Sequence, residues 1–151
     1  MEKLDYNVSI TVDTTPEQAF KRINNVSKWW ATKEFNGKFE GLSTNLHDEF
    51  IVEFGDVHYS KHKLVEVIPN KKVVWLVTDS KLNWIENDKF EWTNTKMIFE
   101  IIPKGNKTTI HFKHEGLVPG QECYDNCVKG WDAIIKQNLF NYMTDDKMFL
   151  I

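Results

Sequence analysis

One long amphipathic segment near the C-terminus constrains the fold of this chain most strongly. After Pro119-Gly120, a subset of positions recurs at intervals of three and four as far as Tyr142, which is typical of a helix of twenty-odd residues with one buried face. The intervening positions are mostly charged or amide side chains, so the opposite face is exposed to solvent. The rest of the chain must therefore supply a partner for the buried face. The recurring positions are Tyr124, Cys127, Val128, Trp131, Ile134, Ile135, Asn138, Leu139 and Tyr142.

Most of the sequence before this segment has the period-two pattern of β-strands. Residues 4–12 alternate between apolar and polar side chains, which predicts a strand with one buried face. A threonine followed by Pro16 and Glu17 predicts the start of a short helix, and a second helical turn carries Trp29 and Trp30. Short turns between the later strands indicate antiparallel pairing. These strands are predicted near residues 38–41, 49–54, 58–68, 71–78, 95–102 and 107–115.

The stretch from residue 79 to 94 is too long for a hairpin turn and is rich in large apolar side chains. Two interpretations are open. The segment is either an ordered extension packed against the sheet or a lid over the entrance to a ligand site. Its large apolar residues are Leu82, Trp84, Ile85, Phe90 and Trp92.

Charge and hydropathy exclude several classes of partner. The chain has 19 basic and 22 acidic residues, with a net charge of -3, and the two signs are scattered. The sequence shows no basic patch, so we expect it to bind neither nucleic acid nor an anionic membrane surface. The sequence also has no long uncharged apolar run, so we expect neither a signal peptide nor insertion into a membrane. We therefore expect a single cytoplasmic domain that spans residues 1–151.

The cysteines and histidines give little support for a metal site or a disulfide. Cys123 and Cys127 lie four apart in the predicted helix, where a disulfide has poor geometry, so reduced thiols are expected. His58 and His62 lie four apart on a strand, about 13 Å from each other, which is too far for one metal ion. We expect both at the surface. This leaves His114 as the histidine that points inward, and we expect neither a metal nor another cofactor.

The order of short motifs along the chain is a further guide to its fold. The motifs are Thr15-Pro16-Glu17-Gln18-Ala19-Phe20, Trp29-Trp30, Val65-Glu66-Val67-Ile68-Pro69, Val73-Val74-Trp75, Thr95-Lys96-Met97-Ile98-Phe99-Glu100, Lys107–Gly116 and Gly130-Trp131. In this order they resemble the START-like, or SRPBCC, superfamily, and within it the branch named for the activator of the heat-shock protein 90 ATPase (AHSA). The resemblance implies an α+β helix-grip fold. In such a fold a curved antiparallel sheet of about seven strands surrounds a long C-terminal helix, in the order β-α-α-β-β-β-β-β-β-α.

A helix-grip fold often encloses an apolar cavity between the sheet and the helix, and this resemblance is what suggests a ligand site here. Alternation along the late strands and periodicity along the helix place one set of side chains toward that space. For each of them an ordinary role in the core is the competing interpretation, because protein interiors are closely packed. The candidate ligand-binding residues are Trp29, Trp75, Met97, Phe99, Phe112, His114, Cys127, Trp131 and Ile135.

Three functions are compatible with this reading. The first is a non-catalytic protein that binds a small hydrophobic molecule in the cavity. The second is a cyclase- or hydrolase-like enzyme in which His114 acts as general acid or base, although no second catalytic group is evident. The third is a co-chaperone module that acts on heat-shock protein 90. We assign no catalytic residue, and a homodimer is compatible with all three.

Overall fold

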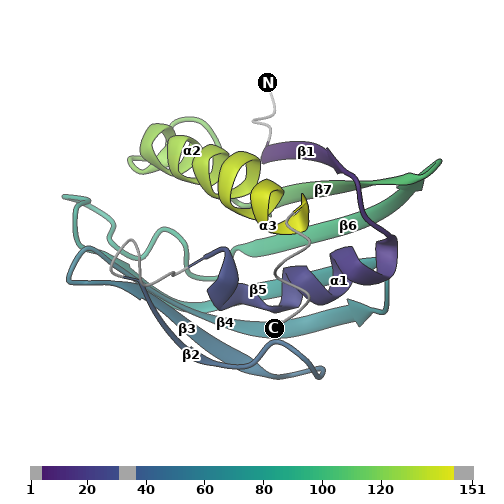
Figure 1. Ribbon diagram of the computed structural model, residues 1–151. Helices are drawn as coiled ribbons and strands as arrows, with labels where there is room; N and C mark the ends of the chain where they lie inside the picture. Colours follow the sequence, from purple (N-terminus) through teal and green to yellow (C-terminus); the bar gives the residue numbers. More distant parts are fainter. Residues whose placement is uncertain (1–4, 31–36, 145–151) are drawn as a thin grey trace.

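The computed structural model describes residues 5–30 and 37–144, and it contains the expected α+β helix-grip fold (Figure 1). Within the described residues, seven strands form one antiparallel sheet in the order β1-β7-β6-β5-β4-β3-β2. The elements are β1 (Tyr6–Val12), α1 (Pro16–Asn24), η1 (Val26–Lys28), β2 (Gly37–Gly41), β3 (Glu49–Phe54), β4 (His58–Ile68), β5 (Lys72–Leu82), β6 (Lys96–Lys104), β7 (Lys107–Glu115), α2 (Tyr124–Ala133), η3 (Ile134–Leu139) and α3 (Phe140–Thr144).

The alternation at the start of the chain is confirmed in β1. Tyr6, Ile10 and Val12 are buried, whereas the residues between them on the other face are exposed. Leu4, which the pattern also included, lies outside the described residues. β1 pairs antiparallel with β7 along its whole length, so the first and last strands of the chain are neighbours in the sheet.

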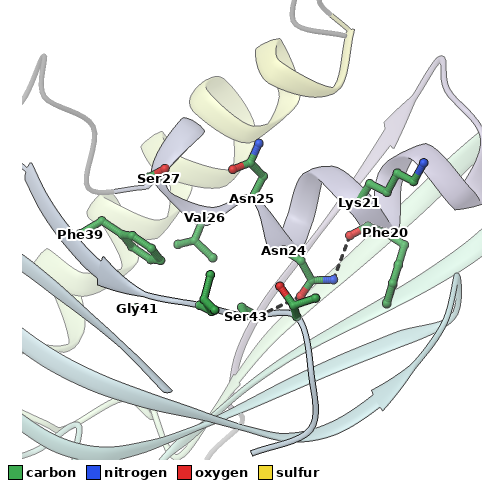
Figure 2. A pocket seen from close by; sticks show the side chains of 11 residues that line it. Phe20, Lys21, Asn24, Asn25, Val26, Ser27, Phe39, Gly41 and Ser43 are labelled. Atoms are coloured by element: carbon green, nitrogen blue, oxygen red, sulfur yellow. Dashed lines mark hydrogen bonds between the residues drawn. The ribbon is translucent and has the colours of Figure 1, made fainter. Parts of the chain in front are cut away.

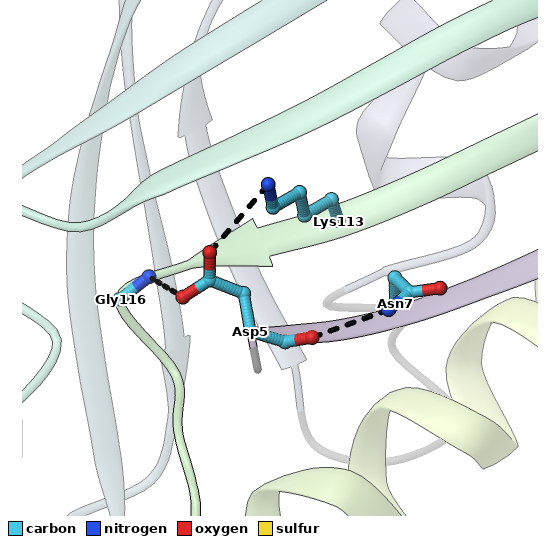
Figure 3. A network of polar contacts seen from close by, with 4 residues as sticks. All are labelled: Asp5, Asn7, Lys113 and Gly116. Atoms are coloured by element: carbon cyan, nitrogen blue, oxygen red, sulfur yellow. Dashed lines mark hydrogen bonds and ion pairs between the residues drawn. The ribbon is translucent and has the colours of Figure 1, made fainter. Parts of the chain in front are cut away.

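Polar contacts fix the point where β1 begins against the point where β7 ends (Figure 3). A carboxylate oxygen of Asp5 accepts a hydrogen bond from the backbone N–H of Gly116 at 3.0 Å, and the other lies 3.5 Å from the ammonium of Lys113. The side-chain amide of Asn7 donates to the backbone carbonyl of Asp5 at 3.2 Å. These contacts hold the end of β7, and with it His114, in a fixed position.

The sheet bends where β4 meets β5. Their pairing is irregular between Lys61 and His62 and again between Leu64 and Glu66. Such irregularities bend a strand and increase its twist, and Figure 1 shows α1 and the C-terminal helix together on one side of the bent sheet. β5 continues to Leu82, beyond the predicted end near residue 78.

Local capping and one buried cation connect α1 to the C-terminal helix. The hydroxyl of Thr15 accepts the backbone N–H of Gln18 at 3.2 Å, and Pro16 occupies the first turn, as the sequence predicts. The guanidinium of Arg22, which is buried, donates to the backbone carbonyl of Tyr142 and lies 5.0 Å from the centre of its ring. α1 is thereby anchored to α3.

The predicted C-terminal helix runs through α2, η3 and α3, and η3 is a π-helical segment. Its buried face carries Cys127, Trp131, Ile135 and Leu139, in agreement with the sequence periodicity. In the described part of the chain no helix is long and apolar enough to cross a membrane. As the sequence predicts, one face of this helix packs on the sheet and the other is exposed.

Candidate ligand site between the sheet and the C-terminal helix

A crevice of about 130 Å³ lies between the sheet and α2. Its lining comes from the segment after η1, from β3 and β4, from the segment that connects β5 to β6, from α2 and from the start of η3. The lining residues are Trp30, Phe54, His58, Trp84, Trp92, Asn126, Cys127, Gly130, Trp131 and Ile134.

Aromatic rings form the inner wall of the crevice. Trp92 and Trp131 stack with their ring centres 5.7 Å apart and an angle of 6° between their planes. Trp30 lies 5.0 Å from Trp131, and the imidazole of His58 lies 4.9 Å from Trp92 in an edge-to-face arrangement. Such rings provide large, rigid apolar surfaces that suit a flat apolar guest.

The connection between β5 and β6 supplies the outer wall and is held against the residues just before α2. Ile85 and Trp92 are buried, whereas Trp84 is 38% exposed. The carboxylate of Glu122 accepts the backbone N–H groups of Glu86 and Asn87, at 3.2 and 3.0 Å. The segment is thus an ordered part of the fold that packs on it and that also borders the crevice.

The expected surface position of His62 is wrong, because its imidazole is fully buried on the inward face of β4. His58 lies on the same face and is half-buried at the crevice. Burial lowers the pKa of His58 to about 4. Burial also holds the pKa of His62 well below its usual value, with smaller contributions from His58 and His114. Both side chains are therefore neutral near pH 7.

Alternation in β4 is the sequence signal that could have placed these histidines inside. His58 and His62 fall in the same period-two set as Leu64, whereas Lys61 and Lys63 fall in the opposite set. Two lysines on one face and a leucine on the other indicate which face is buried. His114 is consequently one of three inward-facing histidines among the described residues.

His114 is a fixed structural link. The indole N–H of Trp131 donates to Nδ1 of His114 at 3.0 Å, so Nδ1 carries no proton. Neutral His114 is then protonated on Nε2, which donates to the hydroxyl of Thr95 at 2.8 Å, and that hydroxyl donates to the backbone carbonyl of Trp92 at 2.6 Å. Burial lowers the pKa of His114 to about 3. Both ring nitrogens are used within the protein, and the imidazole does not line the crevice.

Only two of the nine candidate ligand-binding residues, Cys127 and Trp131, line the crevice. His114 lies behind the rings of Trp92 and Trp131, at 5.0 and 5.9 Å between ring centres. The other six are fully buried and pack against core side chains; for example, the rings of Trp75 and Phe99 are 5.1 Å apart. These six are Trp29, Trp75, Met97, Phe99, Phe112 and Ile135.

The remaining lining residues were not among the sequence candidates. Trp84 and Trp92 stood out in the sequence as aromatic residues of a long connection, but neither was assigned to the site. Ile134 belongs to the recurring apolar positions of the helix, so helical periodicity already indicated that it faces the sheet. For Phe54 and Asn126 the sequence carries no distinguishing signal, because each has an ordinary place in a strand or a helix. The pocket forms only where these elements meet.

The two cysteines are free thiols next to each other at the start of α2. A hydrogen bond from the Cys123 thiol lowers the pKa of Cys127, and the same bond raises the pKa of Cys123. Cys127 is thus the more readily ionised thiol, and it is the one that borders the crevice. Among the residues described, no group of three histidine, cysteine or acidic side chains could hold a metal ion.

A second, wider pocket of about 400 Å³ lies between α1, η1 and the end of β2 (Figure 2). Two polar side chains of its lining, Asn24 and Ser43, are paired within the protein. The hydroxyl of Ser43 donates to the side-chain oxygen of Asn24 at 2.9 Å and accepts the indole N–H of Trp75 at 2.9 Å. The side-chain N–H of Asn24 donates to the backbone carbonyl of Phe20 at 3.0 Å. The sheet–helix crevice is the better candidate because aromatic rings enclose it and one imidazole nitrogen in its wall has no described protein partner.

A bent antiparallel sheet that holds one C-terminal helix on its inner side defines a START-like domain of the helix-grip class. Residues 13–144 match the family model described as "Activator of Hsp90 ATPase homolog 1-like protein". The chain belongs to this family, as its motifs predict. A search of curated proteins found no match.

Solved structures agree with this fold. The Aha1 dimer from Colwellia psychrerythraea is 19% identical, with a TM-score of 0.74, and the match covers 95% of this chain and 98% of that one. A putative uncharacterized protein from Rhizobium leguminosarum is 11% identical, with a TM-score of 0.73 and coverage of 94% and 95%. CalU16 from Micromonospora echinospora is 7% identical, with a TM-score of 0.61 and coverage of 95% and 78%.

Proposed function

We propose that this protein binds a small, largely apolar molecule in the sheet–helix crevice and does not transform it. The observation that carries the proposal is the aromatic wall formed by Trp30, Trp92 and Trp131 around an open volume of about 130 Å³. Ligand sites are typically concave and lined by apolar and aromatic side chains with few polar groups. The crevice is likewise concave and lined mainly by aromatic side chains, but its volume is small.

The volume limits the size of the ligand. An apolar cavity of about 150 Å³ accommodates benzene, whereas drug-sized ligands occupy about 300–1,000 Å³. One six-membered ring therefore fits the crevice as it stands. A larger molecule would have to displace Trp84, which is the most exposed of its tryptophans. For a ligand of six heavy atoms, a binding free energy of about -5 kcal/mol corresponds to a Kd of about 0.2 mM.

We place binding above the two other functions for different reasons. The enzyme alternative relied on His114, whose ring nitrogens are both engaged inside the protein. Action on heat-shock protein 90 rests on a family description, whereas the crevice is a feature of this chain's own residues. We also propose a cytoplasmic location, supported by the two free thiols, and localisation of a fluorescent fusion tests it.

Gly130 offers a sharp test of the binding proposal. It lies in α2 at the crevice, and no atom is within 4 Å of where its Cβ would lie. Gly130→Leu should fill the crevice, while the replacement of a helical glycine favours folding by up to about 1 kcal/mol. Loss of binding in a variant that is no less stable therefore cannot be explained by unfolding.

The experiment measures binding of benzene and toluene by chemical-shift changes of the tryptophan indole N–H groups. Gly130→Ala is the matched control, because it gains the same helix preference with much less added volume. We expect saturable binding to the native chain and to Gly130→Ala, and at least tenfold weaker binding to Gly130→Leu. Absence of binding to the native chain, or equal binding to all three proteins, would contradict the proposal.

We further propose that two copies of the chain associate, because the similarly folded Aha1 protein of Colwellia psychrerythraea is described as a dimer. Sedimentation equilibrium over a range of concentrations tests this. A single species with the 17.8 kDa mass of the monomer would refute it.

A further inference from the structure

Three polar side chains of β4 form a continuous contact that ends at the crevice. His58, Ser60 and His62 share the inward face of the strand because they are two residues apart. The hydroxyl oxygen of Ser60 lies 2.8 Å from Nε2 of His58 and 2.8 Å from Nε2 of His62. One hydroxyl therefore bridges two imidazoles.

The number of available protons restricts this bridge to two arrangements. Ser60 has one hydroxyl proton, so it can donate to only one imidazole and must accept from the other. Both imidazoles are neutral near pH 7, because burial lowers the pKa of each. Either His62 donates to Ser60 and Ser60 donates to His58, or the order is reversed. The two arrangements differ in which nitrogen of each ring carries the proton.

The surroundings of His62 distinguish the two arrangements. Its Nδ1 is buried and has no hydrogen-bond partner among the described residues, and the rings of Phe50 and Trp30 lie 4.6 and 5.1 Å from its own. In the reversed order this nitrogen would carry a proton, leaving a buried N–H without an acceptor, and such orphan donors are rare in proteins. In the forward order it carries only a lone pair. The forward order, from His62 through Ser60 to His58, is therefore favoured.

The forward order determines what His58 offers to the crevice. Nε2 of His58 accepts the proton of Ser60, so the ring proton must be on Nδ1. Within the described residues the only hydrogen-bond partner of this ring is Ser60, on Nε2. Nδ1 of His58 is not among the buried atoms that lack a partner, and the residue lines the crevice. Its N–H is consequently available to a bound molecule.

We propose that His62, Ser60 and His58 form a one-way hydrogen-bond chain that ends in an N–H donor at the crevice. The preferred ligand is then a single flat ring that carries a hydrogen-bond acceptor, such as a ring nitrogen or a carbonyl group. A ring whose polar atom only donates is disfavoured, because it would face the N–H of His58 without an acceptor. This ligand preference rests on the proposed binding function, whereas the direction of the chain does not.

The first test measures the direction of the chain without a ligand. Long-range proton–nitrogen correlation spectra of the native protein distinguish protonated from unprotonated ring nitrogens. We expect the proton of His58 on Nδ1 and that of His62 on Nε2. Protonation of His62 on Nδ1 would overturn the proposal. His114, whose proton the contact with Trp131 places on Nε2, is an internal reference in the same spectra.

The second test measures the ligand preference with three probes of similar size: benzene, pyridine as an acceptor, and pyrrole as a donor. Their affinities are compared for the native chain and for Ser60→Ala, which frees His58 to adopt either protonation pattern. Hydration differences between the probes cancel when the pyridine-to-pyrrole affinity ratio is compared between the two proteins. We expect this ratio to be about five- to tenfold higher in the native chain, as one hydrogen bond warrants.

The outcomes separate this inference from the binding function. Tight benzene binding with an unchanged pyridine-to-pyrrole ratio would refute the acceptor preference and leave the binding function intact. Failure of all three rings to bind would refute the binding function and the ligand preference together, while the nitrogen spectra still decide the direction of the chain. If Ser60→Ala does not fold, the spectra of the native protein decide the proposal.

Discussion

Mild acid should destabilise this protein strongly, because it holds three neutral inward-facing histidines, of which His62 and His114 are fully buried. The pKa values of His58 and His114 are lowered to about 4 and about 3, and that of His62 is well below its usual value. Between these values and about 6.5, the unfolded chain binds protons that the folded chain does not. The free energy of unfolding therefore rises with pH in this window and falls as the solution is acidified.

The size of the effect follows from these shifts. Acidification from pH 7 to pH 5.5 costs about 1.2 kcal/mol for each histidine that stays neutral in the fold, and about 4 kcal/mol for three. A small domain has a free energy of unfolding of about 5–15 kcal/mol. The expected loss is thus a large part of the whole, and it occurs above the pH at which ordinary carboxylates titrate.

Urea unfolding at a series of pH values between 5.5 and 7.5 measures this loss. We expect a slope that approaches three protons per molecule at the acid end of the range, and His58→Phe should lower it by about one. The control is His47→Asn, which replaces an imidazole that is exposed on the folded protein. A free energy of unfolding that hardly changes over this range, or an equal slope in His58→Phe and the native chain, would refute the reasoning.

Two further predictions concern the end of strand β2 and a thiol. Gly41 has φ of +116°, and an added Cβ would lie 2.3 Å from a backbone oxygen of β3, so Gly41→Ala should destabilise by roughly 3 kcal/mol. Gly55, with positive φ but open space around its Cβ position, is the control and should lose only about 1 kcal/mol, as urea unfolding would show; equal losses would contradict this account. Iodoacetamide should modify Cys127 before Cys123, and a bound ring should slow that reaction, which peptide mass spectrometry measures. Modification of Cys123 before Cys127 would contradict the predicted order of reactivity, and an unchanged rate at Cys127 with the ring present would contradict its place at the ligand site.

The fold could be predicted because its determinants are local and periodic. The alternation of β1, the helix start at Thr15-Pro16 and the three-to-four spacing through Trp131 each depend on neighbours in sequence, and each is confirmed. The missed extension of β5 to Leu82 has a different cause. Its residues beyond 78 are mostly polar, and pairing with β4 holds them in the sheet, which no local pattern reveals.

The crevice could not be located from the sequence because it is the space that packing leaves unfilled. Alternation identified Phe99 and Phe112 as inward-facing, but whether inward side chains enclose a cavity or fill it depends on their combined volume. In this fold Trp29, Trp75 and those phenylalanines pack against one another and fill the core. Open volume remains in the crevice beside α2 and in the wider pocket between α1, η1 and the end of β2.

The partners of the three inward-facing histidines determine which of them a molecule in the crevice could contact. His114 is sealed by Trp131 and Thr95, and the second nitrogen of His62 is enclosed by aromatic rings. Each of these imidazoles is held neutral in the core, and neither lines the crevice. Only His58 reaches the crevice wall. The other side chain next to His58 in this hydrogen-bond chain is a serine that is itself buried. A second ionisable side chain that lines the crevice is the thiol of Cys127. A single imidazole with a lowered pKa in an aromatic wall is suited to orienting a ligand through one hydrogen bond.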